Sequence, residues 1–380
     1  MPAKAVDRAM ASPWPVWPEG FGATEEDRRA LLVLSALRGI TPRSLLPIAI
    51  ERGSAAATLT WIARGAAGSQ RDRALARTLR AEDIEGAAKA CGSRFITWSS
   101  PEYPAQLRQI HDPPAALYVI GRLPTDVTSA VAVVGARRCT ELGREAAHEI
   151  GHGLGLAGVT VVSGAARGID AAAHEGALGV KGSTLAVLGS GLDVAYPFDG
   201  RSLVRRIARE GSLFSEYPPG VPPNAYHFPA RNRIVAGLCR ATVVVEGAER
   251  SGSMITAEHA MEFGRDVFAV AGAPNSALSH TPLQLIREGA TLIRGSDDLL
   301  SDLGLELDRP RIERQVALDP AERRILAEVI EPALPDRLAA SIGMPVPEVV
   351  GTLMRLELRG FVRNIGGRFE TTLKPRPTKA

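Results

Sequence analysis

Six short apolar runs that alternate with helical segments constrain the fold of this chain more than any other feature of its sequence. The runs are rich in Val, Leu and Ala, and they cover residues 130–135, 159–164, 183–189, 212–217, 241–247 and 266–272. Strands that are buried on both faces of a sheet have this composition. Because helical patterns separate the runs, the connections are crossovers. The sequence therefore predicts an α/β fold, with a Rossmann-like, doubly wound and mostly parallel sheet.

The residues before the sheet have two different patterns. Residues 1–23 are rich in Pro and Trp and contain no periodicity, so we expect a flexible N-terminal arm. Residues 24–90 predict a small helical domain of the helix-hairpin-helix or SAM-like type, with a capping-type start at Thr24 and Asp27 and a turn at 39–42. This domain either serves packing alone or contacts nucleic acid, and the pattern favours neither.

The Rossmann-like domain is expected over residues 91–308 and a winged helix over residues 318–374. The latter shows three helical patterns followed by a hairpin with a turn at Gly366 and Gly367. From Gly351 to the end, seven basic residues face two acidic ones, a net of +5. Winged helices bind DNA or other proteins, and both roles stay open.

Composition excludes several classes of protein. The net charge is only +3, with 45 basic and 42 acidic residues, so any basic site must be local. Cys91, Cys139 and Cys239 lie far apart without metal-ligand spacing, which predicts neither a disulfide framework nor a metal site. No signal-peptide pattern and no run of roughly 18 apolar residues occur, so we expect a cytoplasmic protein without a membrane partner.

Loops rich in Gly and polar residues follow four of the predicted strands, at 135–138, 163–170, 189–191 and 246–253. Ligands of open α/β sheets lie outside the carboxyl ends of the strands, and helix N-termini there bind anions. Arg137, Arg138, Arg167 and Arg250 add positive charge to these loops. The loops predict a phosphate-binding rim. Since neither GxGxxG nor a Walker sequence is present, we expect no nucleotide cofactor.

The segment 222–237 places Phe228 shortly before Arg231, Asn232 and Arg233. We expect a strand-end loop in which the ring stacks on a base, worth roughly 1–3 kcal/mol, while arginine forks bind phosphate. In the alternative interpretation Phe228 fills the core, and an arginine pairs internally with Glu216 or Glu246.

Taken together, these motifs resemble those of the DNA-processing protein A (DprA/Smf) family. The resemblance runs from about residue 95 to 300 and rests on VVGARRCTELG, VVSGAARGIDAAAHEGAL, LAVLGSGLDVAYP, SEYPPGVPPNAYHFPARNRIVAGL and VVVEGAERSGSMITAEHAMEFGRDVFAVAG, in this order. It implies a homodimeric protein that binds and protects single-stranded DNA through the Rossmann-like domain. It also implies a role in loading the RecA recombinase during natural transformation.

The resemblance also implies the site residues. Arg137 would contact phosphate, Phe228 would stack on a base, and Arg201 would supply a further basic contact. Arg231, Asn232 and Arg233 would lie beside the Phe228 ring. The remaining residues would line the anion pocket (Ser163, Gly164, Arg167 and Gly168) or close it at a helix N-terminus (Ser251, Gly252 and Ser253). The sequence departs from the family at 199–201, where an acidic-Asn pair and a lysine are common, so that contact depends on Arg201 alone.

An enzymatic alternative starts from the segment SGSMITAE. It resembles a motif of nucleotide phosphoribohydrolases of the lysine-decarboxylase-like (LOG) type, which would use Glu258 with an arginine. Glu258 and Asp170 are the obvious carboxylates for acid–base work, although Glu258 also fits a surface helix. The sequence shows no recognisable Ser-His-Asp or Cys-His arrangement, so we expect a non-enzymatic DNA-binding mediator without catalytic residues.

Overall fold

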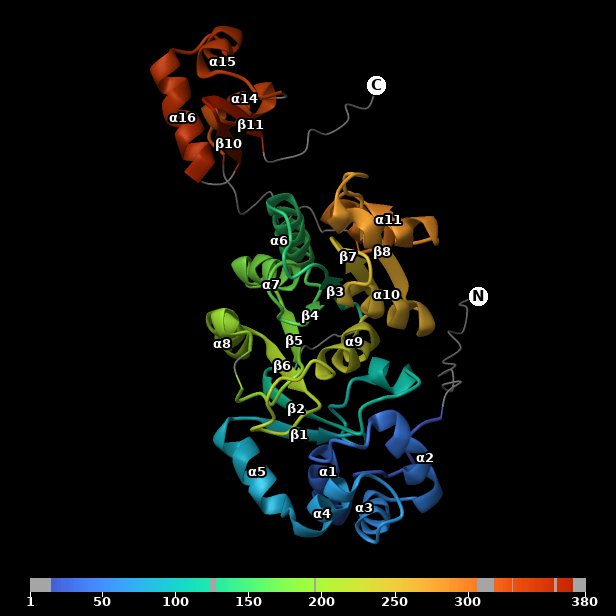
Figure 1. The fold of residues 1–380 in the computed structure, drawn as a ribbon. Helices are drawn as coiled ribbons and strands as arrows, with labels where there is room; N and C mark the ends of the chain where they lie inside the picture. The colour runs from blue at the N-terminus through green and yellow to red at the C-terminus, as the bar shows by residue number, and fades with distance from the viewer. Residues whose placement is uncertain are drawn as a thin grey trace, which may run out of the picture. The chain divides into compact units, whose positions relative to one another are not determined.

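A computed structural model of the chain describes residues 15–123, 128–194, 196–305, 318–329, 331–358 and 361–371 (Figure 1). The chain divides into two compact units, Met1–Leu307 and Asp308–Ala380. The first unit holds both the helical region that precedes the sheet and the sheet itself. In the described part of the chain, no helix is long and apolar enough to cross a membrane.

The first unit is built on a nine-stranded sheet. Its order is β1-β2-β6-β5-β4-β3-β7-β8-β9. The strands are β1 (Arg94–Thr97), β2 (Ala116–Gly121), β3 (Val131–Val134), β4 (Val161–Ser163), β5 (Thr184–Leu188), β6 (Ser212–Ser215), β7 (Ala241–Val244), β8 (Asp266–Val270) and β9 (Thr291–Ile293). All pairs from β6 to β9 are parallel, whereas β1 and β2 add an antiparallel edge. The six predicted runs are β3 to β8, which confirms the doubly wound α/β fold.

Helices cover both faces of this sheet, because side chains on successive strand residues point to opposite faces. Val131, Val133 and Val161 pack under α6 (Glu141–Leu156) and α7 (Ile169–Gly179). On the other face, Ala132 and Val134 share a core with α9 (His227–Leu238) and α10 (Gly252–Glu262). The other helices around the sheet are α8 (Arg201–Glu210), α9 (His227–Leu238), α10 (Gly252–Glu262), α11 (His280–Arg287), α12 (Ser296–Asp302) and the short 3-10 turns η1 (Ala105–Gln109), η2 (Phe198–Gly200) and η3 (Ala277–Ser279).

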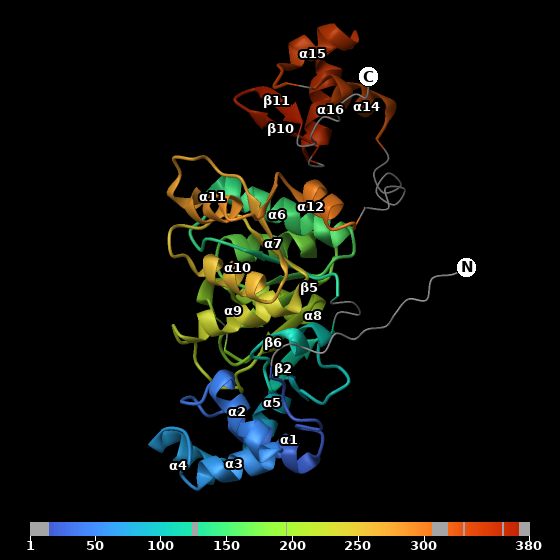
Figure 2. The same cartoon turned by 90° about the vertical axis from the view of Figure 1, so that its right-hand side faces the viewer.

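Five further helices lie at the β1 edge of the sheet (Figure 1, Figure 2). They are α1 (Glu25–Ser35), α2 (Pro42–Arg52), α3 (Ala55–Ala63), α4 (Gln70–Thr78) and α5 (Ala81–Ala90). The predicted start of the first helix is confirmed, since the Thr24 hydroxyl accepts a hydrogen bond from the Asp27 amide at 3.1 Å. Buried residues of these helices belong to the same apolar clusters as sheet residues. The helical region is thus fused to the sheet.

The prediction of a flexible arm over residues 1–23 is wrong for residues 15–23. Trp17 and Phe21 are only 2% and 0% exposed, and their rings stack with centroids 5.0 Å apart. The Trp17 indole Nε1 donates to the Pro113 carbonyl at 3.0 Å. A segment without periodicity can still bury large side chains, because an irregular backbone does not place its buried residues at regular intervals. Residues 1–14 lie outside the described residues.

The second unit has its own apolar core and the elements of a winged helix. They are α14 (Pro320–Glu328), α15 (Pro335–Ile342), α16 (Val346–Leu358), β10 (Val362–Ile365) and β11 (Arg368–Thr371). Gly366 and Gly367 adopt φ of 60° and 85°, which confirms the predicted hairpin turn. Of the basic residues counted from the sequence, Arg363 pairs with Glu370. Arg359, Lys374, Arg376 and Lys379 lie outside the described residues.

Candidate functional site

The order of the strands reverses at β3 and β7, and a cavity lies beyond the carboxyl ends of the strands there. Open α/β sheets bind ligands at such a reversal. The cavity has two adjoining lobes of about 210 and 550 Å³, which we call together the strand-end pocket. Arg137, Gly164, Tyr196, Phe228 and Arg231 line both lobes. Three of the glycine-rich loops, those after β3, β4 and β5, reach the smaller lobe.

Most of the site residues implied by the sequence gather at this pocket. Those that line it are Arg137, Gly164, Arg167, Phe228, Arg231, Asn232, Ser251, Gly252 and Ser253. Four others do not line it: Ser163, Gly168, Arg201 and Arg233.

The aromatic wall of the pocket is made by Phe228. The expectation of a loop here is wrong, because Phe228 lies in the first turn of α9. Its half-buried ring packs against the backbone of Gly189, where an added Cβ would come within 3.1 Å of it. The Tyr196 ring lies 5.4 Å away and the Arg137 guanidinium 5.0 Å above the ring centroid. The ring therefore packs against a backbone glycine and a second aromatic ring, with an exposed cation over it.

The floor of the pocket carries the buried charge of Arg231, which is 5% exposed and donates to the Val187 carbonyl. A Cβ at Gly164 would overlap its guanidinium, so glycine lets Arg231 lie against the backbone there. Burial lowers the pKa of Arg231 to about 10, so it stays protonated at neutral pH. Asp170 is nearby, but its carboxylate accepts the Gly164 and Ala166 amides at 3.1 and 3.3 Å. The floor therefore presents a buried guanidinium beside the Asp170 carboxyl, whose pKa burial raises.

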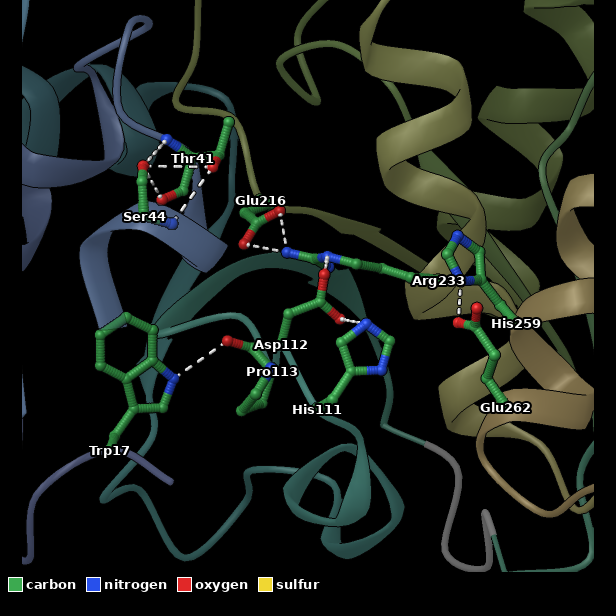
Figure 3. Close-up of polar contacts among 10 residues, drawn as sticks. All are labelled: Trp17, Thr41, Ser44, His111, Asp112, Pro113, Glu216, Arg233, His259 and Glu262. Carbon is green, nitrogen blue, oxygen red and sulfur yellow. Dashed lines mark hydrogen bonds and ion pairs between the residues drawn. The ribbon is translucent and has the colours of Figure 1, made fainter. Parts of the chain in front are cut away.

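Arg233 points away from the pocket. Successive residues of a helix are turned by about 100°, so two side chains two positions apart lie on nearly opposite faces. The Arg233 guanidinium lies 2.8 Å from Glu216 and 3.3 Å from Asp112 (Figure 3). Burial opposes its charge, but these two carboxylates raise its pKa overall. The internal pair with Glu216, an alternative left open by the sequence, is present.

The other residues outside the pocket shape its rim. The Ser163 hydroxyl is buried and donates to the Val133 carbonyl at 2.6 Å. Gly168 has φ of 78°, and a Cβ there would lie 2.3 Å from the Ala136 carbonyl oxygen. Arg201 is exposed and stacks on Phe198, with its Cζ 3.9 Å from the ring centroid. These residues position the loops or lie beyond the cavity.

A helix N-terminus closes the larger lobe. Helix α10 starts at Gly252 after Ser251, whose side chain makes no capping bond. The Ser251 hydroxyl instead lies 2.6 Å from that of Ser253, and Asn232 Nδ2 donates to the Gly252 carbonyl at 3.0 Å. The first amides of α10 are therefore available to an anion.

Sequence reasoning missed Tyr196, which lines both lobes. An aromatic residue shortly after the loop 189–191 was the available signal. The carboxylates of the enzymatic alternative do not meet in the pocket: Glu258 is exposed on α10 and lines neither lobe, and Asp170 is tied to backbone amides. Within the described ranges, no three His, Cys, Asp or Glu residues form a potential metal site.

Comparisons with known proteins identify the family of this chain. Residues 94–304 match the family model for DNA recombination-mediator protein A, and residues 310–368 match the DprA winged helix domain. Protein Smf of Synechocystis is 38% identical over 71% of this chain and 77% of its own length. The DNA processing protein DprA of Streptococcus pneumoniae is 46% identical over 53% of this chain and 71% of its own.

Two solved structures extend the likeness to the fold. The X-ray structure of DprA from Streptococcus pneumoniae has a TM-score of 0.64 and 37% identity, and the match covers 73% of this chain and 97% of that one. A DprA from Helicobacter pylori, described for its single-stranded DNA binding mode, has a TM-score of 0.50 and 27% identity over 56% of this chain and 97% of its own. The chain belongs to the DNA-processing protein A (DprA/Smf) family.

Proposed function

We propose that this protein binds single-stranded DNA in the strand-end pocket, protects it, and helps to load the RecA recombinase in natural transformation and recombination. The observation that carries the binding proposal is the half-buried Phe228 ring, with Arg137 above it and Arg231 in the floor. Family membership and the DprA of Helicobacter pylori, described for its single-stranded DNA binding mode, support it.

Different groups in the pocket suit the phosphates and the bases of the strand. Exposed Arg137 and the free amides of α10 suit phosphate oxygens, and the Phe228 ring suits the face of a base. In a duplex the faces of the bases are already stacked on their neighbours, so the pocket favours single strands. Stacking accepts every base, so we expect little sequence preference.

The test is binding of single-stranded against double-stranded oligonucleotides over a range of salt concentrations. We expect single strands to bind more tightly, with log affinity falling by about 0.7 per neutralised phosphate for each unit of log salt. Equal affinity for both forms, or no dependence on salt, would contradict the proposal. Release of free base from nucleoside monophosphates would favour the phosphoribohydrolase alternative.

Homodimer formation and RecA loading rest on family membership rather than on contacts within this chain. Light scattering of the purified protein tests the dimer. Loading is tested by the rate at which RecA assembles on single strands with and without this protein, and we expect faster assembly with it. An unchanged rate would leave a binding protein without the mediator role.

A further inference from the structure

A second groove lies beside the strand-end pocket, between α1, α2 and α9. We call it the front groove; its volume is about 620 Å³. It shares Asn224 and Pro229 with the larger lobe of the pocket, so the two cavities adjoin at the start of α9. Its walls are largely apolar and include Trp17, Leu31, Leu34, Leu37, Ile40 and Val221.

The floor of the front groove holds unused hydrogen-bonding capacity. Arg233 lines the groove between Glu216 and Asp112 (Figure 3). It is only 4% exposed, and its Nη1 has no hydrogen-bond partner within the described part of the chain. A buried N–H without a partner costs free energy, and an acceptor that displaced the atoms covering it would recover that cost. Donor and carboxylate acceptors side by side match the edge of a nucleobase, which carries both kinds of group.

The rim of the front groove, unlike its buried floor, is exposed and carries positive charge. Tyr226 precedes α9 by one residue, is 85% exposed and lines the groove. Arg38 and Arg43 are exposed cations on the same rim. His227 also lines the groove, and burial together with the charge of Arg38 lowers the pKa of its imidazole. The positive charge of the rim therefore comes from Arg38 and Arg43, in the part of the chain that precedes the sheet.

Two exposed aromatic rings, those of Tyr196 and Tyr226, line the two cavities. Tyr196 lines the strand-end pocket and Tyr226 the front groove, on either side of Phe228. Exposed rings next to arginines are what binding of successive bases requires.

We propose that a single strand leaving the strand-end pocket passes over Tyr226 and places a further base in the front groove, while Arg38 and Arg43 hold the flanking phosphates. The inference rests on the proposed function and extends its site onto the helices that precede the sheet. In the floor, the Glu216 and Asp112 carboxyl oxygens beside the Arg233 guanidinium can accept the amino groups of a base. The cationic rim holds the sugar–phosphate backbone of the strand outside the groove.

The first test compares oligothymidylates of about 4 to about 16 nucleotides, the range of site sizes known for single-strand-binding folds. We expect Tyr226→Ala to weaken binding of the long oligonucleotides about tenfold and to leave the shortest within about twofold. Tyr226→Trp restores the affinity, because it keeps a stacking surface. An equal loss at every length would place Tyr226 in the strand-end pocket and overturn the inference.

The second test removes the rim charges with the double variant Arg38→Gln, Arg43→Gln. The salt slope for long oligonucleotides should fall by about 0.7 for each lost phosphate contact, with no change for the shortest. Arg71→Gln is the matched control, since Arg71 is an exposed arginine of α4 that does not line the groove. If control and double variant change the slope equally, the rim makes no specific contact.

Photocrosslinking separates this inference from the proposed function. A long oligothymidylate with 5-iododeoxyuridine at successive positions should crosslink to Phe228 and, from a neighbouring position, to Tyr226. Crosslinking to Phe228 without Tyr226 would overturn the front-groove path and keep the proposed function. Absence of single-strand binding by the unaltered protein would overturn both.

Discussion

Phe228→Ala tests whether the ring at the pocket wall serves binding or packing. The ring is half-buried and packs against Gly189 and Tyr196, with the Arg137 guanidinium over it. A fully buried Phe costs about 3–5 kcal/mol when truncated, so we expect a loss of about 1–2 kcal/mol in unfolding free energy here. Loss of base stacking should weaken single-strand binding by about 1–3 kcal/mol, or about 5- to 150-fold.

The assay measures oligonucleotide affinity and melting temperature on the same preparations. Phe228→Tyr should keep most of the affinity, because the ring persists. Phe214→Ala is the control for packing: Phe214 is 0% exposed on β6 and lines neither lobe, so it should lose stability and keep affinity while folded. Normal affinity of Phe228→Ala together with a lowered melting temperature would refute the stacking role.

The remaining predictions concern charge, domains and pH. Arg137→Ala should weaken binding of all sequences alike and reduce the salt slope by about 0.7; a slope equal to that of the unaltered protein would remove this residue from the phosphate contacts. Deletion of Asp308–Ala380, a separate compact unit, should leave single-strand affinity largely intact; loss of most binding in a folded truncated protein would move the main site to the winged helix. Arg233→Met should destabilise the fold by about 3–5 kcal/mol, because two buried carboxylates lose their partner; a melting temperature like that of the unaltered protein would contradict this. Burial lowers the pKa of His174 to about 3, below its value in the unfolded chain. The stability that His174 contributes is therefore present above about pH 6.5 and is lost as the pH falls toward 3. In denaturant titrations the unfolding free energy of His174→Met should fall less steeply with acid, and an equal fall would show that another group is responsible.

The parallel strands could be predicted from the sequence because their residues are buried on both faces, which leaves continuous apolar runs. The edge strands could not. In β9 only Ile293 is buried, and β1 has two buried residues out of four, so neither differs clearly from a loop in composition. The glycine-rich loops were also recognisable, since the positive φ of Gly168 and its close approach to the Ala136 carbonyl oxygen leave room only for glycine.

The site was harder to predict within α9. Phe228, Arg231 and Arg233 stand in one motif, and a loop would allow all three to face the same ligand. As a helix, the segment turns Arg231 into the pocket and Arg233 toward Glu216 and Asp112. Proline at 222, 223 and 229 favoured the interpretation as a loop, although Pro229 is tolerated in the first turn of a helix. The burial of Trp17 left no periodic signal at all.

The anchoring of Trp17 also sets an order of events during synthesis. Its partner Pro113 lies 96 residues further along the chain, so the N-terminal segment cannot reach its final position until that residue has left the ribosome. Strand β2, which follows Pro113, pairs with β6 (Ser212–Ser215), so this pairing also requires residues that are synthesised later. Contacts of such long sequence separation form late and slow folding. The amino-terminal helices, although made first, therefore complete their packing only after more than half of the chain has been translated.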